Sequence, residues 1–94
     1  MSQPLRRYDR ASLPPSERIL LGELLEAHRR PPSPAGERAE ITSAIARTHI
    51  PMLIVRKILR RWQERGWAID EEGSLTMAGI QAAEAEERAQ QAWS

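Results

Sequence analysis

Hydrophobic positions in the first half of the chain recur at helical spacing in two stretches. The first stretch consists of Ile19, Leu20, Leu24 and Ala27. It follows prolines that suit a first helical turn, so a helix is predicted over residues 15–29. The proline-rich segment 30–36 cannot continue this helix, because each proline removes a backbone donor and restricts the preceding residue. A second helix is predicted over residues 37–48, with Ile41 and Ile45 facing the core.

A third apolar stripe begins shortly after the second predicted helix. Its members are Val55, Ile58, Leu59 and Trp62. Pro51 suits the first turn of a helix and Gly66 suits a left-handed stop, so the third helix is predicted over residues 51–65. A chain of 94 residues buries about one hydrophobic core, and we expect these helices to form it.

The pattern changes after Gly66 to short segments that are compatible with β-structure. Residues 67–69 and 74–76 flank the turn-like sequence Asp70-Glu71-Glu72-Gly73, which predicts a small two-stranded hairpin. Thr76 is suited to cap a last helix over residues 77–92. The expected fold is therefore mainly α, with a three-helix core, a β-hairpin and a C-terminal helix in one domain of residues 15–93.

Composition limits the compartment and the chemistry. The chain has no cysteine, so it has neither disulfides nor a thiolate zinc site, and a reducing compartment is expected. Its N-terminus lacks the apolar run of a signal peptide, and the longest apolar stretch, residues 50–55, is too short to span a bilayer. We therefore expect a cytoplasmic protein that makes no contact with a membrane.

The formal net charge of +1 conceals a strong asymmetry along the chain. Residues 1–65 hold 13 of the 14 basic and 7 of the 13 acidic residues, a net charge of +6, whereas residues 66–94 carry −5. Such asymmetry indicates a polyanionic partner for the basic part. Nearly all the basic residues are arginines, which favour bidentate contacts with phosphate, although a GC-rich genome explains this bias equally well.

The first 14 residues are interpreted as a basic N-terminal arm, because they contain Arg6, Arg7 and Arg10 but few residues to bury. Arms of this kind sometimes enter the minor groove of DNA. A frayed terminus is the simpler interpretation.

Three sequence segments together resemble the winged helix-turn-helix superfamily, in the form found in small bacterial repressors. Residues 41–47 (ITSAIAR) are similar to its first helix, and residues 55–67 (VRKILRRWQERGW) to its recognition helix. Residues 73–79 (GSLTMAG) are similar to the passage from the wing to the next helix. The resemblance implies a transcriptional regulator that binds double-stranded DNA, usually as a two-fold dimer, with the third helix in the major groove.

The residues of the third helix agree with this expectation. Arg56, Lys57, Arg60 and Arg61 fan across the face opposite the apolar stripe, where they are expected to contact phosphates, with Met52, Leu53 and Arg56 at the bases. Thr42, Ser43 and Arg47 on the preceding helix are expected to add backbone contacts. An ordinary solvated helix face is the alternative interpretation of the basic stripe.

The apolar start of the third helix and the acidic turn favour a different class of function. Base edges require donors and acceptors, but the sequence there is Ile50-Pro51-Met52-Leu53-Ile54, and the acidic turn would be repelled by phosphate. The alternative is a protein-interaction module or inhibitor that uses Met52, Leu53 and Ile54. A structural or oligomerisation subunit of a mobile-element protein is a third interpretation.

Catalytic chemistry is not indicated by any motif in the sequence. His28 and His49 have no second ligand at metal spacing, and there is no phosphate-binding glycine loop or nucleophile elbow. We expect no enzyme activity, no cofactor and no metal. Trp62 and Trp67 are predicted to pack together. A homodimer, if formed, is expected to use the first or the last helix.

Overall fold

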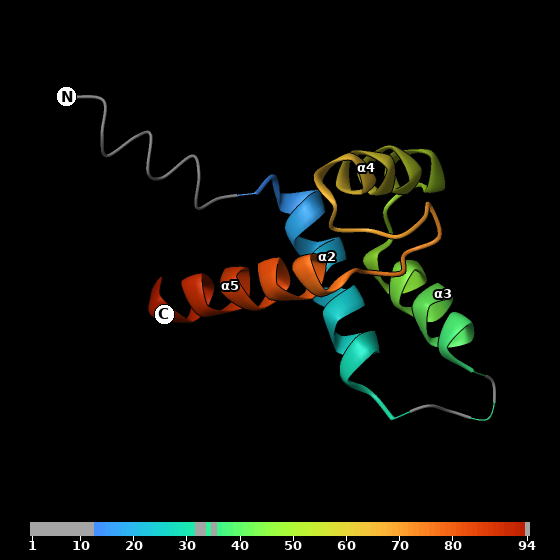
Figure 1. Ribbon diagram of the computed structural model, residues 1–94, viewed down its shortest axis with the longest axis horizontal. Helices are drawn as coiled ribbons and strands as arrows, with labels where there is room; N and C mark the ends of the chain where they lie inside the picture. Colours follow the sequence, from blue (N-terminus) through green and yellow to red (C-terminus); the bar gives the residue numbers. More distant parts are fainter. Residues whose placement is uncertain (1–12, 32–33, 35, 94) are drawn as a thin grey trace.

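The computed structural model describes residues 13–31, 34 and 36–93, and four helices occupy most of this part of the chain (Figure 1). They are α2 (Pro15–Arg29), α3 (Glu37–Thr48), α4 (Met52–Arg65) and α5 (Met77–Trp93). Every helix lies within one residue of its predicted bounds. Residues 1–12 of the expected arm lie outside the described residues.

Local signals in the sequence set the ends of these helices. Pro15 occupies the first turn of α2, and Gly66 ends α4 in the left-handed conformation with φ of 82°. The prediction that Thr76 caps the last helix is confirmed, because its Oγ1 accepts a hydrogen bond from the Gly79 N–H at 3.1 Å. Pro51 differs slightly from its prediction: it is the cap residue before α4 rather than the first residue of the helix.

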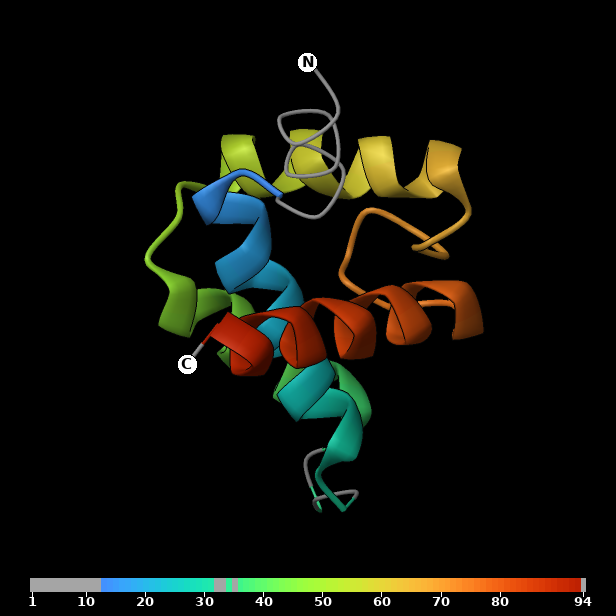
Figure 2. The same ribbon diagram turned by 90° about the vertical axis from the view of Figure 1, so that its left-hand side faces the viewer.

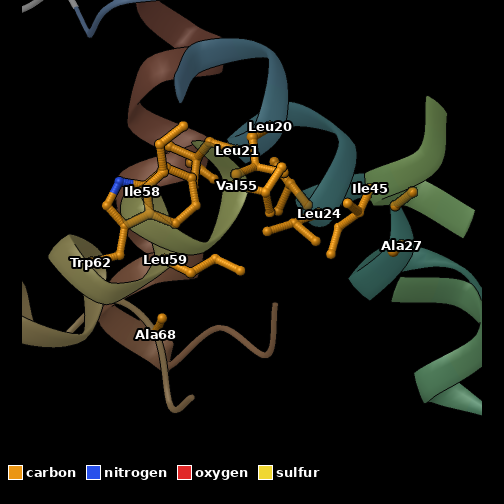
Figure 3. Packing of buried hydrophobic residues seen from close by; sticks show 13 residues of the cluster. Leu20, Leu21, Leu24, Ala27, Ile45, Val55, Ile58, Leu59, Trp62 and Ala68 are labelled. Atoms are coloured by element: carbon orange, nitrogen blue, oxygen red, sulfur yellow. The ribbon is translucent and has the colours of Figure 1, made fainter. Parts of the chain in front are cut away.

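The core lies where α2 meets the apolar faces of the other helices (Figure 3). Its largest fully buried side chains are Trp62, Leu20, Leu21, Leu59 and Val55. α2 packs against both α3 and α5, while α4 lies across the N-terminal end of α2 (Figures 1 and 2). All four predicted members of the α4 stripe are buried, so this helix is held by one face and exposes the other.

The predicted two-stranded hairpin, and with it the wing of the expected fold class, is wrong. Over residues 66–76 the structure has no strand, and a single antiparallel bridge joins Ala68 to Leu75. The N–H groups of Trp67 and Ala68 donate to the carbonyl oxygen of Trp62. Two hydrogen bonds cross the loop, from the Ile69 N–H to the Ser74 carbonyl oxygen and from the Thr76 N–H to the Trp67 carbonyl oxygen, each at 2.8 Å. Segments of three residues make too few ladder bonds to form a stable hairpin once the Trp67 and Ala68 donors are used elsewhere. The chain is mainly α, as expected, with an irregular loop between α4 and α5.

This loop packs against the core through Trp67. The ring centroids of Trp62 and Trp67 are 6.2 Å apart, which confirms the prediction that the two indoles pack together. α5 then begins so close to the loop that a Cβ on Gly79 would lie 2.1 Å from the carbonyl oxygen of Trp67. A glycine is therefore required where α5 leaves the loop.

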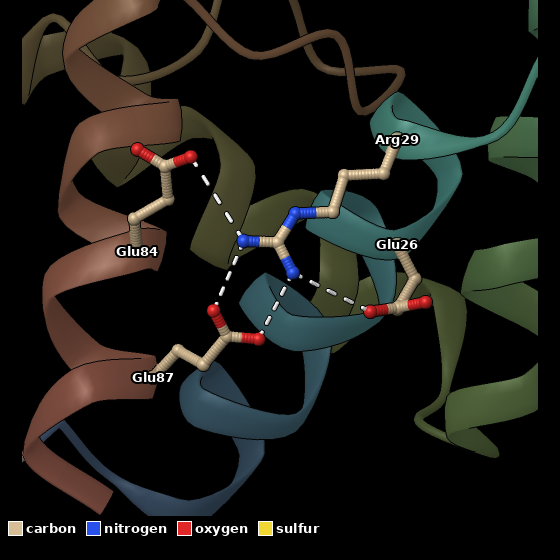
Figure 4. Close-up of polar contacts among 4 residues, drawn as sticks. All are labelled: Glu26, Arg29, Glu84 and Glu87. Carbon is tan, nitrogen blue, oxygen red and sulfur yellow. Dashed lines mark hydrogen bonds and ion pairs between the residues drawn. The ribbon is translucent and has the colours of Figure 1, made fainter. Parts of the chain in front are cut away.

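Ion pairs join α5 to the C-terminal end of α2 (Figure 4). The Arg29 guanidinium donates to both carboxylate oxygens of Glu87, at 2.9 and 3.0 Å, and Glu26 and Glu84 lie within 4 Å of it. The hydrogen bond to Arg29 lowers the pKa of the Glu87 carboxyl below its ordinary value, and the same contact raises the pKa of Arg29.

Among the described helices, none is both long enough and apolar enough to cross a bilayer.

Candidate nucleic-acid interface

The helices α3 and α4, called the helix pair below, are joined by a short turn that local contacts fix. His49 adopts the left-handed conformation with φ of 58°, and its N–H donates to the carbonyl oxygen of Ala46 at 3.2 Å. The Thr48 hydroxyl donates to the carbonyl oxygen of Ile45 at 2.6 Å and accepts from the Ile50 N–H at 3.2 Å. These bonds satisfy polar groups at the end of α3 and set the direction in which α4 departs.

The exposed face of α4 carries the basic residues predicted from the sequence, but it does not present them equally. Arg56 and Lys57 are exposed and make no hydrogen bond or ion pair with any described residue. Arg60 lies 3.4 Å from a carboxylate oxygen of Glu71. The unpaired cations therefore lie together in the N-terminal half of the helix.

Arg61, also predicted to contact phosphate, is held by a buried carboxylate. Its guanidinium donates to Glu17 at 2.8 Å, and the indole N–H of Trp62 donates to the other oxygen of the same carboxylate at 3.0 Å. Glu17 is 3% exposed, so this contact ties the first turn of α2 to α4. The described contacts give Arg61 a structural role.

The predicted residues of α3 are exposed, and two of them have partners within the chain. The Thr42 hydroxyl donates to the carbonyl oxygen of Arg38 at 2.9 Å, so it already has an acceptor in its own helix. Arg47 pairs with Glu23 of α2 at 3.0 Å. Ser43, the next residue along α3, is also exposed.

The apolar residues at the start of α4 are exposed, because they lie in its first turn, before the core stripe that begins at Val55. The exposed fractions of Met52, Leu53 and Ile54 are 50%, 73% and 40%. Met52 also borders a groove of about 850 Å³ between α3, the start of α4 and the loop of residues 71–74. The groove is lined by Glu37, Arg38, Ile41, Thr42, Ile45, Ala46, Ile50, Met52, Arg56, Glu71, Glu72 and Ser74.

The acidic turn contacts both helices of the pair, which the sequence did not indicate. Glu71 pairs with Arg60 of α4, and Glu72 pairs with Arg38 of α3. Glu17 was missed in the same way: its position in the first turn of α2 gives no sign of a partner 44 residues away. In both cases the charge was visible in the sequence, but the pairing depends on the tertiary arrangement.

Metal chemistry finds no support among the residues that the structure describes. No three His, Cys, Asp or Glu side chains in that part of the chain are grouped so that they could hold a metal ion. His28 is exposed at the end of α2, and His49 is exposed in the turn.

No protein-family model, curated protein or solved structure gives a significant match to this chain.

Proposed function

We propose that this chain is a transcriptional regulator that binds duplex DNA through α3 and α4, with α4 in the major groove. The observation that carries the proposal is the pair of adjacent cations, Arg56 and Lys57, which are exposed and unpaired within the described structure on a helix anchored by its opposite face. Such a helix meets two requirements of groove binding: a rigid attachment and cations that are free to contact phosphate.

Phosphate contacts and base contacts are assigned to different residues in this proposal. Lys57 and Arg60 contact the backbone, and Arg56 reads a guanine edge through two parallel hydrogen bonds. Met52 and Leu53 contact thymine methyl groups, which are apolar features of the major groove. The exposed Ser43 on α3 is the candidate for a further phosphate contact.

The proposal includes a two-fold dimer as the assembly and the cytoplasm as the location. A two-fold dimer would place two copies of α4 about one turn of DNA apart, so that they read a palindrome, and α2 and α5 are the helices proposed to pair. A function on DNA requires a compartment that contains DNA, and we place the chain in the cytoplasm.

Fluorescence anisotropy with mixed duplex fragments tests the proposal. Replacing Arg56 and Lys57 together with alanine is expected to weaken binding and to reduce the slope of log K against log salt by about 0.9, the contribution of the one phosphate contact assigned to Lys57. Arg61 is left unchanged because its loss would leave the buried Glu17 carboxylate without its cationic partner.

The matched control removes two cations elsewhere. Arg30 follows α2 and pairs with Glu40 of α3 at 3.5 Å, and Arg88 lies on α5. Neither residue is assigned to DNA, so a variant with alanine at both positions loses the same charge without removing a proposed contact. The proposal expects this control to keep most of the affinity and the salt slope. Equal losses in both double variants, or no binding by the intact chain at low salt, would reject it.

A protein-binding function is the second candidate, and the exposed Met52, Leu53 and Ile54 favour it. Apolar side chains beside a groove with an apolar floor resemble the centre of a protein interface more than a DNA-reading surface. The anisotropy experiment separates the two candidates. A folded chain that binds no duplex at any salt concentration would favour the protein-binding function.

A further inference from the structure

The loop of residues 70–73 is shaped by contacts that fix where its carboxylates lie. The Asp70 side chain accepts a hydrogen bond from the Glu72 N–H at 2.9 Å, which tightens the turn. Gly73 is buried with φ of 113°, and a Cβ at this position would lie 2.7 Å from the side chain of Ile41. The loop is therefore packed on α3, and its acidic tip is held in a defined position.

From this position the two glutamates reach one arginine on each helix of the helix pair. Glu71 pairs with Arg60 on α4, and Glu72 pairs with Arg38 on α3. Both glutamates and Arg38 line the same groove as the unpaired Arg56. The loop thus places two negative charges beside the surface that the proposed function assigns to DNA.

We propose that this acidic loop is an autoinhibitory element in which Glu71 and Glu72 compete with DNA phosphates for Arg60 and Arg38. The inference rests on the proposed function and deepens it, because it names the regulation of the same surface. DNA binding would replace the two carboxylate partners with phosphates. The affinity of the chain for DNA would therefore be low while the glutamates are charged, and it would rise when their charge is removed.

The exposure of these ion pairs makes such competition feasible. The side chains of Arg60 and Glu71 are 65% and 42% exposed, and those of Arg38 and Glu72 are 75% and 55% exposed. Pairs in contact with solvent are individually weak and screened by salt, so a polyanion can displace them. The expected inhibition is consequently moderate and largest at low ionic strength.

The test replaces Glu71 and Glu72 together with glutamine and measures duplex binding over a series of salt concentrations. The variant is expected to bind about 2- to 30-fold more tightly than the unaltered chain at low salt, which corresponds to two released surface pairs. The gain is expected to shrink as salt rises. Circular dichroism checks that the helices are retained.

The matched control is a chain with Glu26→Gln and Glu84→Gln. Both glutamates lie near Arg29, at 3.7 and 3.9 Å, and Arg29 keeps its closer partner Glu87 when they are replaced. This control changes the net charge equally, but at residues of α2 and α5 that pair with neither α3 nor α4, so it is expected to gain little affinity.

The outcomes separate this inference from the function on which it rests. If the unaltered chain binds duplex and the Glu71→Gln, Glu72→Gln variant binds no more tightly than the control, the autoinhibitory loop is overturned while DNA binding stands. If neither the unaltered chain nor the loop variant binds duplex at low salt, the proposed function fails and this inference fails with it.

Discussion

Glu17 shows at the scale of a single residue how a charged group becomes part of the core. Its carboxylate is 3% exposed and accepts hydrogen bonds from the Trp62 indole and the Arg61 guanidinium. Trp62 is itself fully buried, so its N–H has no access to water as an alternative acceptor. A buried donor without a partner costs more than the net value of the bond that it made.

We therefore predict that Glu17→Ala lowers the free energy of unfolding by about 1–3 kcal/mol, because the Trp62 N–H loses its acceptor. Glu17→Gln is expected to lose less, since the amide oxygen still accepts from the indole. Urea denaturation followed by circular dichroism measures both. Glu26→Ala, an exposed glutamate on the same helix, is the control, and an equal loss there would contradict the assigned role of Glu17.

At the scale of elements, the position of α5 depends on a close approach at its start and on ion pairs farther along. Gly79 lies in the first turn of α5 against the backbone of Trp67, and Glu84 and Glu87 reach the end of α2. Among the described side chains of α5 few are buried: Ala83 belongs to the core, and Ile80 packs against it. Small changes at these contacts should therefore be measurable.

Gly79→Ala is predicted to destabilise the fold by about 1–3 kcal/mol, because the added methyl would meet the Trp67 carbonyl oxygen and force α5 to shift. Gly22→Ala is the opposite case: Gly22 is also in a helix, and a Cβ there meets nothing within 4 Å. That variant is expected to gain about 0.5–1 kcal/mol from helix propensity. Thermal unfolding of the two variants compares them directly, and a stabilising Gly79→Ala would refute the close approach.

The ion pair of Arg29 and Glu87 predicts a dependence of stability on pH. The pKa of Glu87 is lower in the folded chain, so its stabilising contribution is present above the unfolded carboxyl pKa of about 4.3 and is lost as the pH falls through the folded pKa. The melting temperature of Glu87→Gln should therefore lie below that of the unaltered chain at neutral pH. The difference should shrink toward zero in acid.

Glu64→Gln is the control for this pH series, because Glu64 is exposed on α4 and makes no ion pair within the described part of the chain. A melting-temperature difference for Glu87→Gln that stays constant from neutral pH to about pH 3 would show that the carboxylate is not coupled to folding.

At the scale of the whole molecule, α2 connects the helix pair to α5, because it contacts both. Its first turn holds α4 through Glu17, and its last turn holds α5 through Arg29. The core side chains of α4 belong to the same buried cluster as Leu20, Leu21 and Leu24 of α2, and the Arg56 and Lys57 face stays outside. The salt dependence predicted for DNA binding belongs to this scale, because it requires α4 to act as a rigid part of the whole fold.

The helices were predictable because their signals are local. Pro15, Gly66 and Thr76 act within a few residues of their own positions, and the apolar stripe of α4 identifies its buried face without knowledge of its neighbours. The loop between α4 and α5 was predicted as a hairpin for the same kind of reason, since its segments look β-compatible when taken alone. The N–H groups of Trp67 and Ala68 bond to the end of α4, so two of the donors that the hairpin prediction required are used by the helix stop.

The sequence by itself determined the four helices, their ends, the buried stripe of α4 and the charge on its exposed face, because periodicity and capping act over one or two turns. The tertiary structure decided which of those charges are free. Arg61 is bound by Glu17, Arg60 by Glu71 and Arg38 by Glu72, whereas Arg56 and Lys57 have no such partner among the described residues. Ion pairing depends on the distance between side chains in space, and residues far apart in sequence acquire that distance only when the helices pack.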